Sequence, residues 1–391
     1  MVIPSWYANP RNKVHGSFFK EQFKALSASG EKVTVAYNEI WPLTMLGKIK
    51  EKRGISFEID EGLRTYRYKD FNYFPKNPIM FKSFNKRMDK LYKEIVKNEG
   101  KVDIIHAHSA FWGAIAADYI SKKYNIPLVI TEHSSLKYAS YSKKSYEKYI
   151  FKSYTDADEL IAVGNGLKNE LEGYVNRDIT VIPNTIDLNI FKKETNNSEC
   201  TKDECFKYFS CSFLVEGKGM EVLIKAFSKE FKDKPGVLRI GGDGPVRNEL
   251  QRLIKENGME DKIILLGALS REEVAEEMRK CHAFVLASEH ETFGVVYIEA
   301  LACGKPVIGT YNGGAEDIIK DYNGIIVEKN NADALGNALL QMKHEYNMYD
   351  KDEIREKTIL SYSEKVIVEK LKGVYKKIYE RATKKSVWHT R

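Results

Sequence analysis

The sequence lacks the features that mark most membrane, secreted and nucleic-acid-binding proteins. Its 391 residues contain no apolar run close to the roughly 18 residues of a membrane span, and no secretory signal segment is visible. Only five cysteines occur, and no two have the Cys-x-x-Cys spacing of a zinc or redox site, so we expect a reduced, cytoplasmic setting. The net charge of +7 is mild for this length and does not indicate a nucleic-acid partner.

What the chain does have is enough apolar sequence for two folded domains. Hydrophobic residues make up 43% and charged residues 30%, which is the balance of a globular protein. Short runs rich in β-branched residues alternate with amphipathic stretches, and this alternation predicts parallel sheets covered by helices on both faces. The expected strands include 32–36, 102–106, 127–131, 159–163, 180–182, 209–214, 237–240, 263–266, 283–287, 306–309 and 324–327. The expected helices include 18–29, 111–124 and 220–227.

A polar stretch rich in Asn, Lys and Glu interrupts this alternation and reads as an interdomain linker. The expected fold class is α/β, with two doubly wound, Rossmann-like domains facing each other across a cleft. Ligands of such sheets bind at the carboxyl ends of the strands, so we expect the chemistry in the strand-to-helix loops. The expected divisions are a first domain at 1–190, a linker at 191–207, a second domain at 208–362 and a helix at 363–391 that crosses back to the first domain.

The most informative stretch is 288–304, which joins an expected strand to an expected helix. The helix should begin near Phe293 or Gly294 and end at Gly304, and its free backbone N–H groups would suit a diphosphate. Two carboxylates, Glu291 and Glu299, frame the start of this helix and can accept hydrogen bonds from hydroxyls. The alternative is a helix-capping glutamate followed by a solvated one.

These residues resemble the Glu-x7-Glu signature of the family 4 glycosyltransferases, and the resemblance extends over nearly the whole chain. The resemblance implies the GT-B fold and retaining transfer from a nucleotide sugar. It assigns Glu291 to the transferred sugar and Glu299 to the ribose, and it turns the backbone of Phe293, Gly294 and Val295 toward the sugar and the phosphates. The resemblance also implies a metal-independent enzyme, and we assign no Asp-x-Asp motif as a metal site. We therefore expect no metal and no cofactor beyond the nucleotide sugar.

Three further segments resemble the donor side of the same family. Gly242 and Gly244 belong to a Gly-Asp-Gly-Pro turn, Lys218 precedes a glycine and would contact donor phosphate, and Gly267 would lie beside the base. A dinucleotide fingerprint is excluded, because Arg247 occupies its third glycine position. The alternatives are a plain tight turn for the glycines and a surface position for the lysine.

One position departs from the family pattern. An Arg usually stands five residues before the donor-binding Lys, and here that position is Phe213. A phenyl ring cannot neutralise phosphate. Lys218 and the helix N-terminus should therefore carry more of that charge, unless another cation reaches the site.

The acceptor side is expected in the first domain. Gly16 lies in a loop that resembles the family's glycine-rich first loop and would approach the donor phosphate, while the neighbouring His15 is a candidate for acceptor binding. His108 and His133 each follow an expected strand. By resemblance His133 orients hydroxyls beside the reacting sugar, and His108 is a second candidate acceptor ligand. A metal site would need a third ligand, which we cannot assign.

The segment 71–97 combines lysines and arginines with aromatic residues. Such a segment can lie on an anionic bilayer, which would suit a lipid-linked acceptor at the inner face of the membrane. The alternative, which we favour slightly, is an amphipathic helix with its rings in the core and its charges in water.

The sequence therefore predicts a retaining glycosyltransferase that uses a UDP- or GDP-sugar and a sugar or lipid-linked acceptor, in surface polysaccharide or glycoconjugate synthesis. Two alternatives stay open. One is a GT-B nucleotide-sugar epimerase, and the other is a non-catalytic subunit that binds sugar or lipid, for which Phe213 is the only support.

Overall fold

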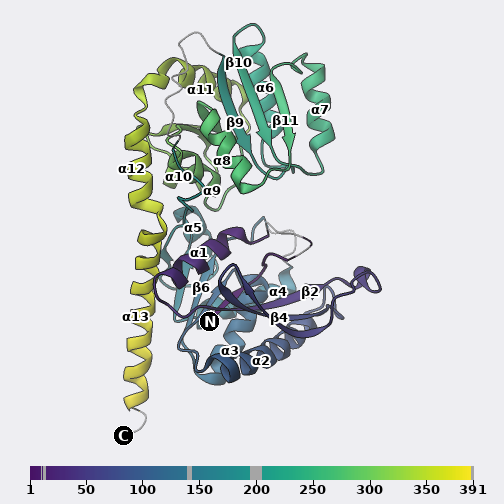
Figure 1. The fold of residues 1–391 in the computed structure, drawn as a ribbon, viewed down its shortest axis with the longest axis vertical. Coiled ribbons are helices and arrows are strands. Elements are labelled where there is room, and N and C mark those ends of the chain that lie inside the picture. Colours follow the sequence, from purple (N-terminus) through teal and green to yellow (C-terminus); the bar gives the residue numbers. More distant parts are fainter. Residues whose placement is uncertain (10, 12–14, 139–142, 194–204, 389–391) are drawn as a thin grey trace. The chain divides into compact units, whose positions relative to one another are not determined.

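A computed structural model describes residues 1–9, 11, 15–138, 143–193 and 205–388. The chain forms two compact units (Figure 1). Unit 1 comprises Met1–Thr185 together with Glu364–Arg391, and unit 2 comprises Ile186–Ser363. The C-terminal helix α13 (Glu364–Trp388) thus belongs to unit 1.

The division between the units comes earlier than the expected end of the first domain at 190. Ile186 forms a β-bridge with Ser363, and Phe191 is fully buried. Arg355 donates to the carbonyl of Phe191 at 3.3 Å. These contacts hold 186–191 on unit 2. Within the expected linker 191–207, residues 194–204 lie outside the described part, and Phe206 already begins a strand of unit 2.

Unit 1 is built on an eight-stranded sheet with the order β3-β4-β2-β1-β5-β6-β7-β8. Its pairs are parallel except the antiparallel pair of β3 with β4, a hairpin absent from the expected elements. The strands are β1 (Val2–Pro4), β2 (Thr34–Trp41), β3 (Gly54–Asp60), β4 (Leu63–Phe71), β5 (Ile105–His108), β6 (Leu128–Glu132), β7 (Glu159–Ala162) and β8 (Thr180–Val181).

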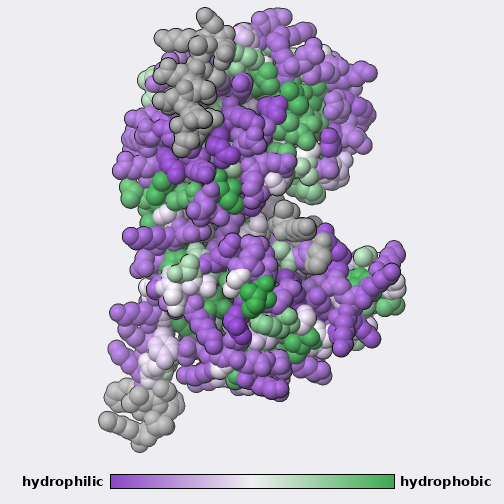
Figure 2. All heavy atoms as spheres, viewed as in Figure 1, coloured by the Kyte–Doolittle hydropathy of each residue, from purple (hydrophilic) through white to green (hydrophobic). Residues whose placement is uncertain are grey.

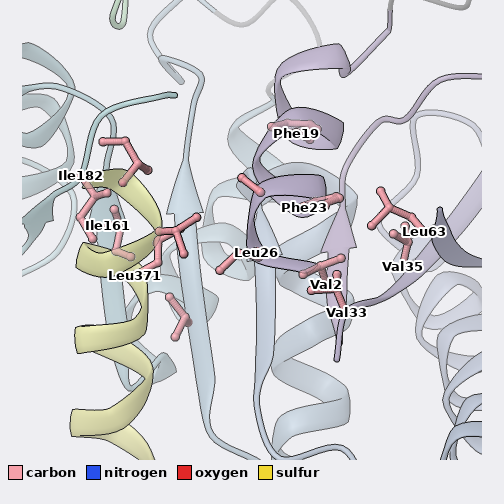
Figure 3. Close-up of a cluster of buried hydrophobic side chains, with 14 of the residues drawn as sticks. Val2, Phe19, Phe23, Leu26, Val33, Val35, Leu63, Ile161, Ile182 and Leu371 are labelled. Atoms are coloured by element: carbon pink, nitrogen blue, oxygen red, sulfur yellow. The ribbon is translucent and has the colours of Figure 1, made fainter. Parts of the chain in front are cut away.

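Helices cover this sheet and close its core. Figure 3 shows Phe19, Phe23 and Leu26 of α1 (Ser17–Ala28) and Leu371 of α13 among the apolar side chains of the buried cluster. The cluster explains why α13 packs on unit 1, since its Ile367, Val368, Leu371 and Ile378 are all buried there. The other helices are α2 (Ile79–Glu99), α3 (Ile115–Tyr124), α4 (Lys144–Asp156) and α5 (Asn165–Glu172), with short turns η1 (Leu43–Met45) and η2 (Ala110–Ala114).

The expected strand and helix on either side of residue 109 have other bounds in the structure. The strand expected at 102–106 is β5, which ends at His108, and the helix expected from 111 begins at Ile115. The π-helical turn η2 separates them, and within it Trp112 has a φ of 76°, outside the helical region. Hydrophobic periodicity continues through this turn, so the pattern alone could not reveal it.

Unit 2 is built on a six-stranded parallel sheet with the order β11-β10-β9-β12-β13-β14. Its strands are β9 (Phe206–Cys211), β10 (Gly236–Gly241), β11 (Ile263–Gly267), β12 (Ala283–Val285), β13 (Val307–Thr310) and β14 (Gly324–Val327). Its helices are α6 (Met220–Phe231), α7 (Arg247–Glu256), α8 (Arg271–Lys280), α9 (Val295–Ala302), α10 (Ala315–Ile318), α11 (Ala332–Glu345) and α12 (Lys351–Tyr362), with the turn η3 (Tyr346–Met348).

The strand orders fix where ligands can bind. In unit 2 the order of the strands reverses between β9 and β12, and in unit 1 it reverses between β1 and β5. A crevice opens outside the carboxyl ends of the strands at such a switch point, because the two flanking connections leave toward opposite faces. The loops after β9, β12, β1 and β5 are therefore the first places to look for a site.

The structure divides the basic, aromatic segment 71–97 into a loop and a helix. Phe81, Phe84 and Tyr92 on α2 are buried in unit 1, whereas Tyr73 and Phe74 in the loop before it are exposed. The rings of the helix therefore belong to the core, as in the favoured alternative. No helix in the described part of the chain is both long and apolar enough to cross a bilayer.

Candidate functional site

An ion pair lies at the switch point of unit 2. Nζ of Lys218, in the loop after β9, donates to Oε1 of Glu291, in the loop after β12, at 2.6 Å. Both side chains keep some access to solvent, with 28% and 14% exposed. The sequence assigned these two residues to the phosphate and the sugar of one donor, and the fold brings them into contact.

Backbone contacts hold the two loops together. Gly219 has a φ of 66°, and a Cβ atom there would lie 1.9 Å from the carbonyl oxygen of Ala287. The backbone N–H of Glu289 donates to the carbonyl of Gly217 at 2.8 Å. Only glycine permits this close approach, so Gly219 determines how near Lys218 comes to Glu291.

Helix α9 begins directly after the second loop. Its N-cap, Gly294, has a φ of 92° and offers no side chain to the first N–H groups of the helix, which suits an anion. Phe293 is buried, with its ring 5.8 Å from that of Tyr362, so only its backbone faces the loop. Val295 is the first helical residue. The helix ends at Ala302, two residues before the expected end, because Cys303 already leaves helical geometry.

Glu299 differs from Glu291 in its surroundings. It is buried on α9, and its Oε1 lies 3.0 Å from a guanidinium nitrogen of Arg271, the first residue of α8. Burial raises the pKa of Glu299, and Arg271 opposes that rise. The sequence analysis missed Arg271. A cation in the first turn of a helix opposes the helix dipole. This unfavourable position is the sequence signal that could have identified Arg271.

The turn at Gly242 and Gly244 packs tightly on the loop after β9. Cβ atoms at these positions would lie 1.9 Å from the carbonyl oxygen of Ser212 and 2.2 Å from that of Leu214. The glycines are therefore required by the turn itself, whether or not a ligand binds. They do not identify a ligand.

A cation lies beside Gly267, where the base was expected. The guanidinium of Arg247 is 3.3 Å from where a Cβ of Gly267 would be, and 3.7 Å from Asp243. At the position where the family has an Arg, the side chain of Phe213 is 64% exposed and supplies no charge.

The switch point of unit 1 carries the predicted histidines. Nδ1 of His108 and Nε2 of His133 share a hydrogen bond of 3.1 Å, and the rings of Phe18 and Phe19 lie 5.3 and 4.8 Å from that of His133. Burial lowers the pKa of His133 to about 3, so it is neutral at ordinary pH. A neutral imidazole can orient hydroxyls without adding charge.

The structure places His108, which was expected as a second acceptor ligand, inside unit 1. Its side chain is fully buried against Phe19 and Phe23, so it cannot touch an acceptor in this structure. Its Nδ1 shares a hydrogen bond with Nε2 of His133. This hydrogen bond can hold the ring of His133 in its orientation.

The loop after β1 brings Gly16 and His15 to the same edge of unit 1. Gly16 has a φ of 74° and caps α1, and a Cβ there would lie 2.8 Å from the carbonyl oxygen of Trp6. His15 is exposed, with its ring stacked 6.1 Å from that of Trp6. Both positions are compatible with ligand contact, and His15 is equally compatible with a plain surface position.

Asn312, in the loop after β13, is a further residue that the sequence analysis missed. Its carbonyl oxygen accepts the backbone N–H of Glu291 at 2.9 Å, and its side-chain oxygen accepts those of Gly314 and Ala315. The Asn-Gly-Gly turn after a strand was the available signal. Among the described residues no cluster of His, Cys, Asp or Glu has the arrangement of a metal site.

Comparison with known proteins gives consistent results for both units. Residues 18–190 match the model described as Glycosyltransferase Family 4, and 192–358 match that described as Glycosyl transferases group 1. An uncharacterized glycosyltransferase of Methanocaldococcus jannaschii is 34% identical over 298 residues, which cover 74% of this chain and 78% of that protein. The N-acetyl-alpha-D-glucosaminyl L-malate synthase of Bacillus anthracis is 29% identical, over 73% and 76% of the two chains. The crystal structure of Anabaena HepE in complex with UDP has the same fold, with a TM-score of 0.73 over 96% of this chain and 99% of that one at 17% identity.

Proposed function

The chain belongs to family 4 of the glycosyltransferases, has the GT-B fold and acts on nucleotide sugars, and from this premise we propose that it is a retaining enzyme with its donor site at the switch point of unit 2. The observation that carries the proposal is the contact of Lys218 with Glu291 beside the start of α9. A cation, a helix N-terminus and a carboxylate that can bind hydroxyls meet at one point. A sugar diphosphate needs these three groups.

The proposed roles of these residues follow from their charges and from their positions around the start of α9. Lys218 and the N–H groups of α9 stabilise the diphosphate as it leaves, when its negative charge grows. Glu291 accepts hydrogen bonds from the hydroxyls of the transferred sugar, and Glu299, held by Arg271, accepts those of the ribose. The backbone at Gly294 and Val295 faces the phosphates.

The proposed reaction is a front-face substitution. The bond from the anomeric carbon to the diphosphate oxygen breaks, and the bond from that carbon to the acceptor oxygen forms on the same face. The acceptor proton moves to the departing phosphate, so no separate protein base is required. His133 orients the hydroxyls of the reacting sugar, and the step needs no metal.

The donor is proposed to be a UDP- or GDP-sugar, and the UDP complex of the structural neighbour HepE supports the first choice. The acceptor is proposed to be a sugar or a lipid-linked sugar of surface polysaccharide or glycoconjugate synthesis, met at the cytoplasmic face of a membrane. A thermal-shift screen with UDP, GDP and their sugars identifies the base.

The decisive test is Glu291→Gln. We expect transfer to fall at least about 100-fold, because the amide cannot replace the charged acceptor beside the sugar. Calorimetric binding of UDP should persist or become tighter, because Lys218 loses its ion-pair partner and is free for phosphate.

Glu289→Gln is the matched control, since Glu289 lies in the same loop with an exposed side chain and should keep full transfer. Full transfer by Glu291→Gln would overturn the assignment of Glu291. Release of an isomeric nucleotide sugar without any acceptor would instead identify an epimerase, and failure to bind any nucleoside diphosphate would identify a non-catalytic subunit.

A further inference from the structure

Two neighbouring loops of unit 1 expose large apolar side chains to solvent. The loop after β2 presents Leu43 and Leu46, which are 38% and 65% exposed. The loop after β4 presents Tyr73 and Phe74, at 44% and 46%, and Ile79 follows at the start of α2 with 50%. Single exposed apolar residues are common, but four in two adjoining loops, with a fifth at the start of α2, form a patch that calls for a partner.

The two loops leave the sheet side by side. β2 and β4 pair in parallel up to Trp41 and Phe71, and the N–H of Asn72 donates to the carbonyl of Trp41 at 2.8 Å. Farther out, Arg53 donates to the hydroxyl of Tyr73 at 2.9 Å and so joins the first loop to the second. In Figure 1 the first loop projects to the right beyond the ends of β2 and β4, and Figure 2 shows hydrophobic atoms set among hydrophilic ones there.

Lysines flank the apolar side chains. Lys48, Lys50 and Lys52 are exposed on the first loop, and within the described part of the chain none of them joins an ion pair. On α2, Lys82 and Lys86 follow Ile79 at helical spacing, so they extend the same face of the helix. The patch therefore has an apolar tip with uncompensated positive charge behind it.

We propose that this docking surface, formed by the loop 42–53, the loop 72–79 and the first turns of α2, binds an anionic lipid bilayer. Apolar side chains at loop tips can enter the interface, and lysines behind them meet acidic headgroups. Tyr73 has the amphipathic side chain typical of the headgroup level. The rings of α2 take no part, since they are buried, so the docking surface uses only the first part of the segment 71–97.

The docking surface lies at the same edge of the sheet as the expected acceptor residues, and this supports a lipid bilayer as its partner. β1, β2, β4, β5 and β6 are all parallel, so the loops that follow them emerge at one edge of the sheet. Gly16 and His133 lie at this edge. A bilayer bound there would hold a lipid-linked acceptor near His133. Binding to the bilayer does not require sugar transfer, so it can be tested independently of the proposed function.

Flotation with vesicles tests the proposal. The full chain should float with phosphatidylcholine vesicles that contain about one third phosphatidylglycerol, should stay behind with phosphatidylcholine alone, and should detach as salt is raised. Replacing Lys48, Lys50 and Lys52 together by Ala should weaken binding by about a hundredfold, at roughly fivefold for each lysine. Leu43→Ser with Leu46→Ser should weaken it on the order of tenfold.

Matched controls lie on unit 2. Leu360 is 66% exposed on α12, and Leu360→Ser should leave flotation unchanged. Lys232, Lys234 and Lys255 are exposed, and their joint replacement by Ala should have little effect. All these changes are at the surface, so equal melting temperatures and equal UDP binding confirm that the variants fold.

The proposal is wrong if the unaltered chain does not float with anionic vesicles at low salt, or if the control variants lose as much binding as the loop variants. A third result also overturns it. If the chain is a dimer that Leu46→Ser converts to a monomer while flotation is unaffected, the docking surface is an interface between copies of this chain.

Discussion

The two donor-side glutamates each face a cation, but their surroundings give these contacts different consequences. Glu291 and Lys218 are partly open to solvent, so a ligand can enter between them and take over both charges. Glu299 is almost wholly buried, and its contact with Arg271 offsets only part of the desolvation of the carboxylate. Glu291 is thus accessible to a ligand, while Glu299 is held in place inside unit 2 by Arg271.

Arg271→Leu should therefore weaken recognition of the ribose. Without the guanidinium the already raised pKa of Glu299 rises further, and a protonated carboxyl is a poorer acceptor for hydroxyls. We expect the KM for the donor to rise about tenfold, which corresponds to about 1.4 kcal/mol, with a smaller effect on kcat. The KM should also fall as the pH is raised, because the carboxyl then ionises.

Arg279→Leu is the control, because Arg279 lies on the same helix and donates to the backbone carbonyl of Ile190 at 3.3 Å. A donor KM for Arg271→Leu that stays at the unaltered value at every pH measured would exclude the positioning role.

At the scale of elements, three histidines link β5, β6 and α13. His106 bonds to Thr131 on β6 at 2.8 Å and to the hydroxyl of Tyr375 on α13 at 2.6 Å. His108, two residues on, bonds to His133. Burial lowers the pKa of His106 and of His133 to about 3. The strands and the C-terminal helix are thus joined through imidazoles that must stay neutral.

Unit 1 should lose stability in mild acid. The ordinary pKa of histidine is about 6.5, so between pH 6.5 and about 3 the unfolded chain binds protons that the folded chain excludes. The free energy of unfolding therefore falls as the pH drops below about 6.5, by about 2 kcal/mol for each such histidine at pH 5. Urea unfolding followed by tryptophan fluorescence at pH 7.5 and pH 5 measures it.

His106→Gln separates this effect from general acid sensitivity. It should lower stability at pH 7.5 but should reduce the further loss at pH 5 by about 2 kcal/mol. His344→Gln, at an exposed position on α11, should behave as the unaltered chain. An unchanged pH dependence in His106→Gln would show that His106 does not titrate on unfolding.

The whole molecule consists of two units with separate cores and a useful asymmetry in composition. All four tryptophans lie in unit 1, at 6, 41, 112 and 388, whereas the proposed donor site lies in unit 2. Tryptophan fluorescence therefore reports unit 1, and UDP binding reports unit 2.

Substitution of matched core leucines should separate the two units. Leu371 on α13 and Leu339 on α11 are both fully buried, and replacement by Ala should cost about 2–5 kcal/mol in each unit. Leu371→Ala should lower the urea midpoint of tryptophan fluorescence and leave UDP affinity unchanged. Leu339→Ala should leave that midpoint unchanged. Equal shifts of the midpoint by both changes would mean that the units unfold as one.

The sequence alone determined much about this protein, because the relevant signals are local. Alternation of strand and helix patterns predicted two parallel α/β units, which the structure confirms. The strand at 324–327 was placed to the residue. The motif from Glu291 to Glu299 indicated the family, and the family models and relatives confirm it.

Only the tertiary structure decided which side chains meet. Lys218 and Glu291 are 73 residues apart, and Arg271 and Glu299 come together because two helices pack, so no local pattern could pair them. Burial is likewise a property of the packed core. It encloses the side chain of His108 and the rings of α2, while Leu46 is left exposed.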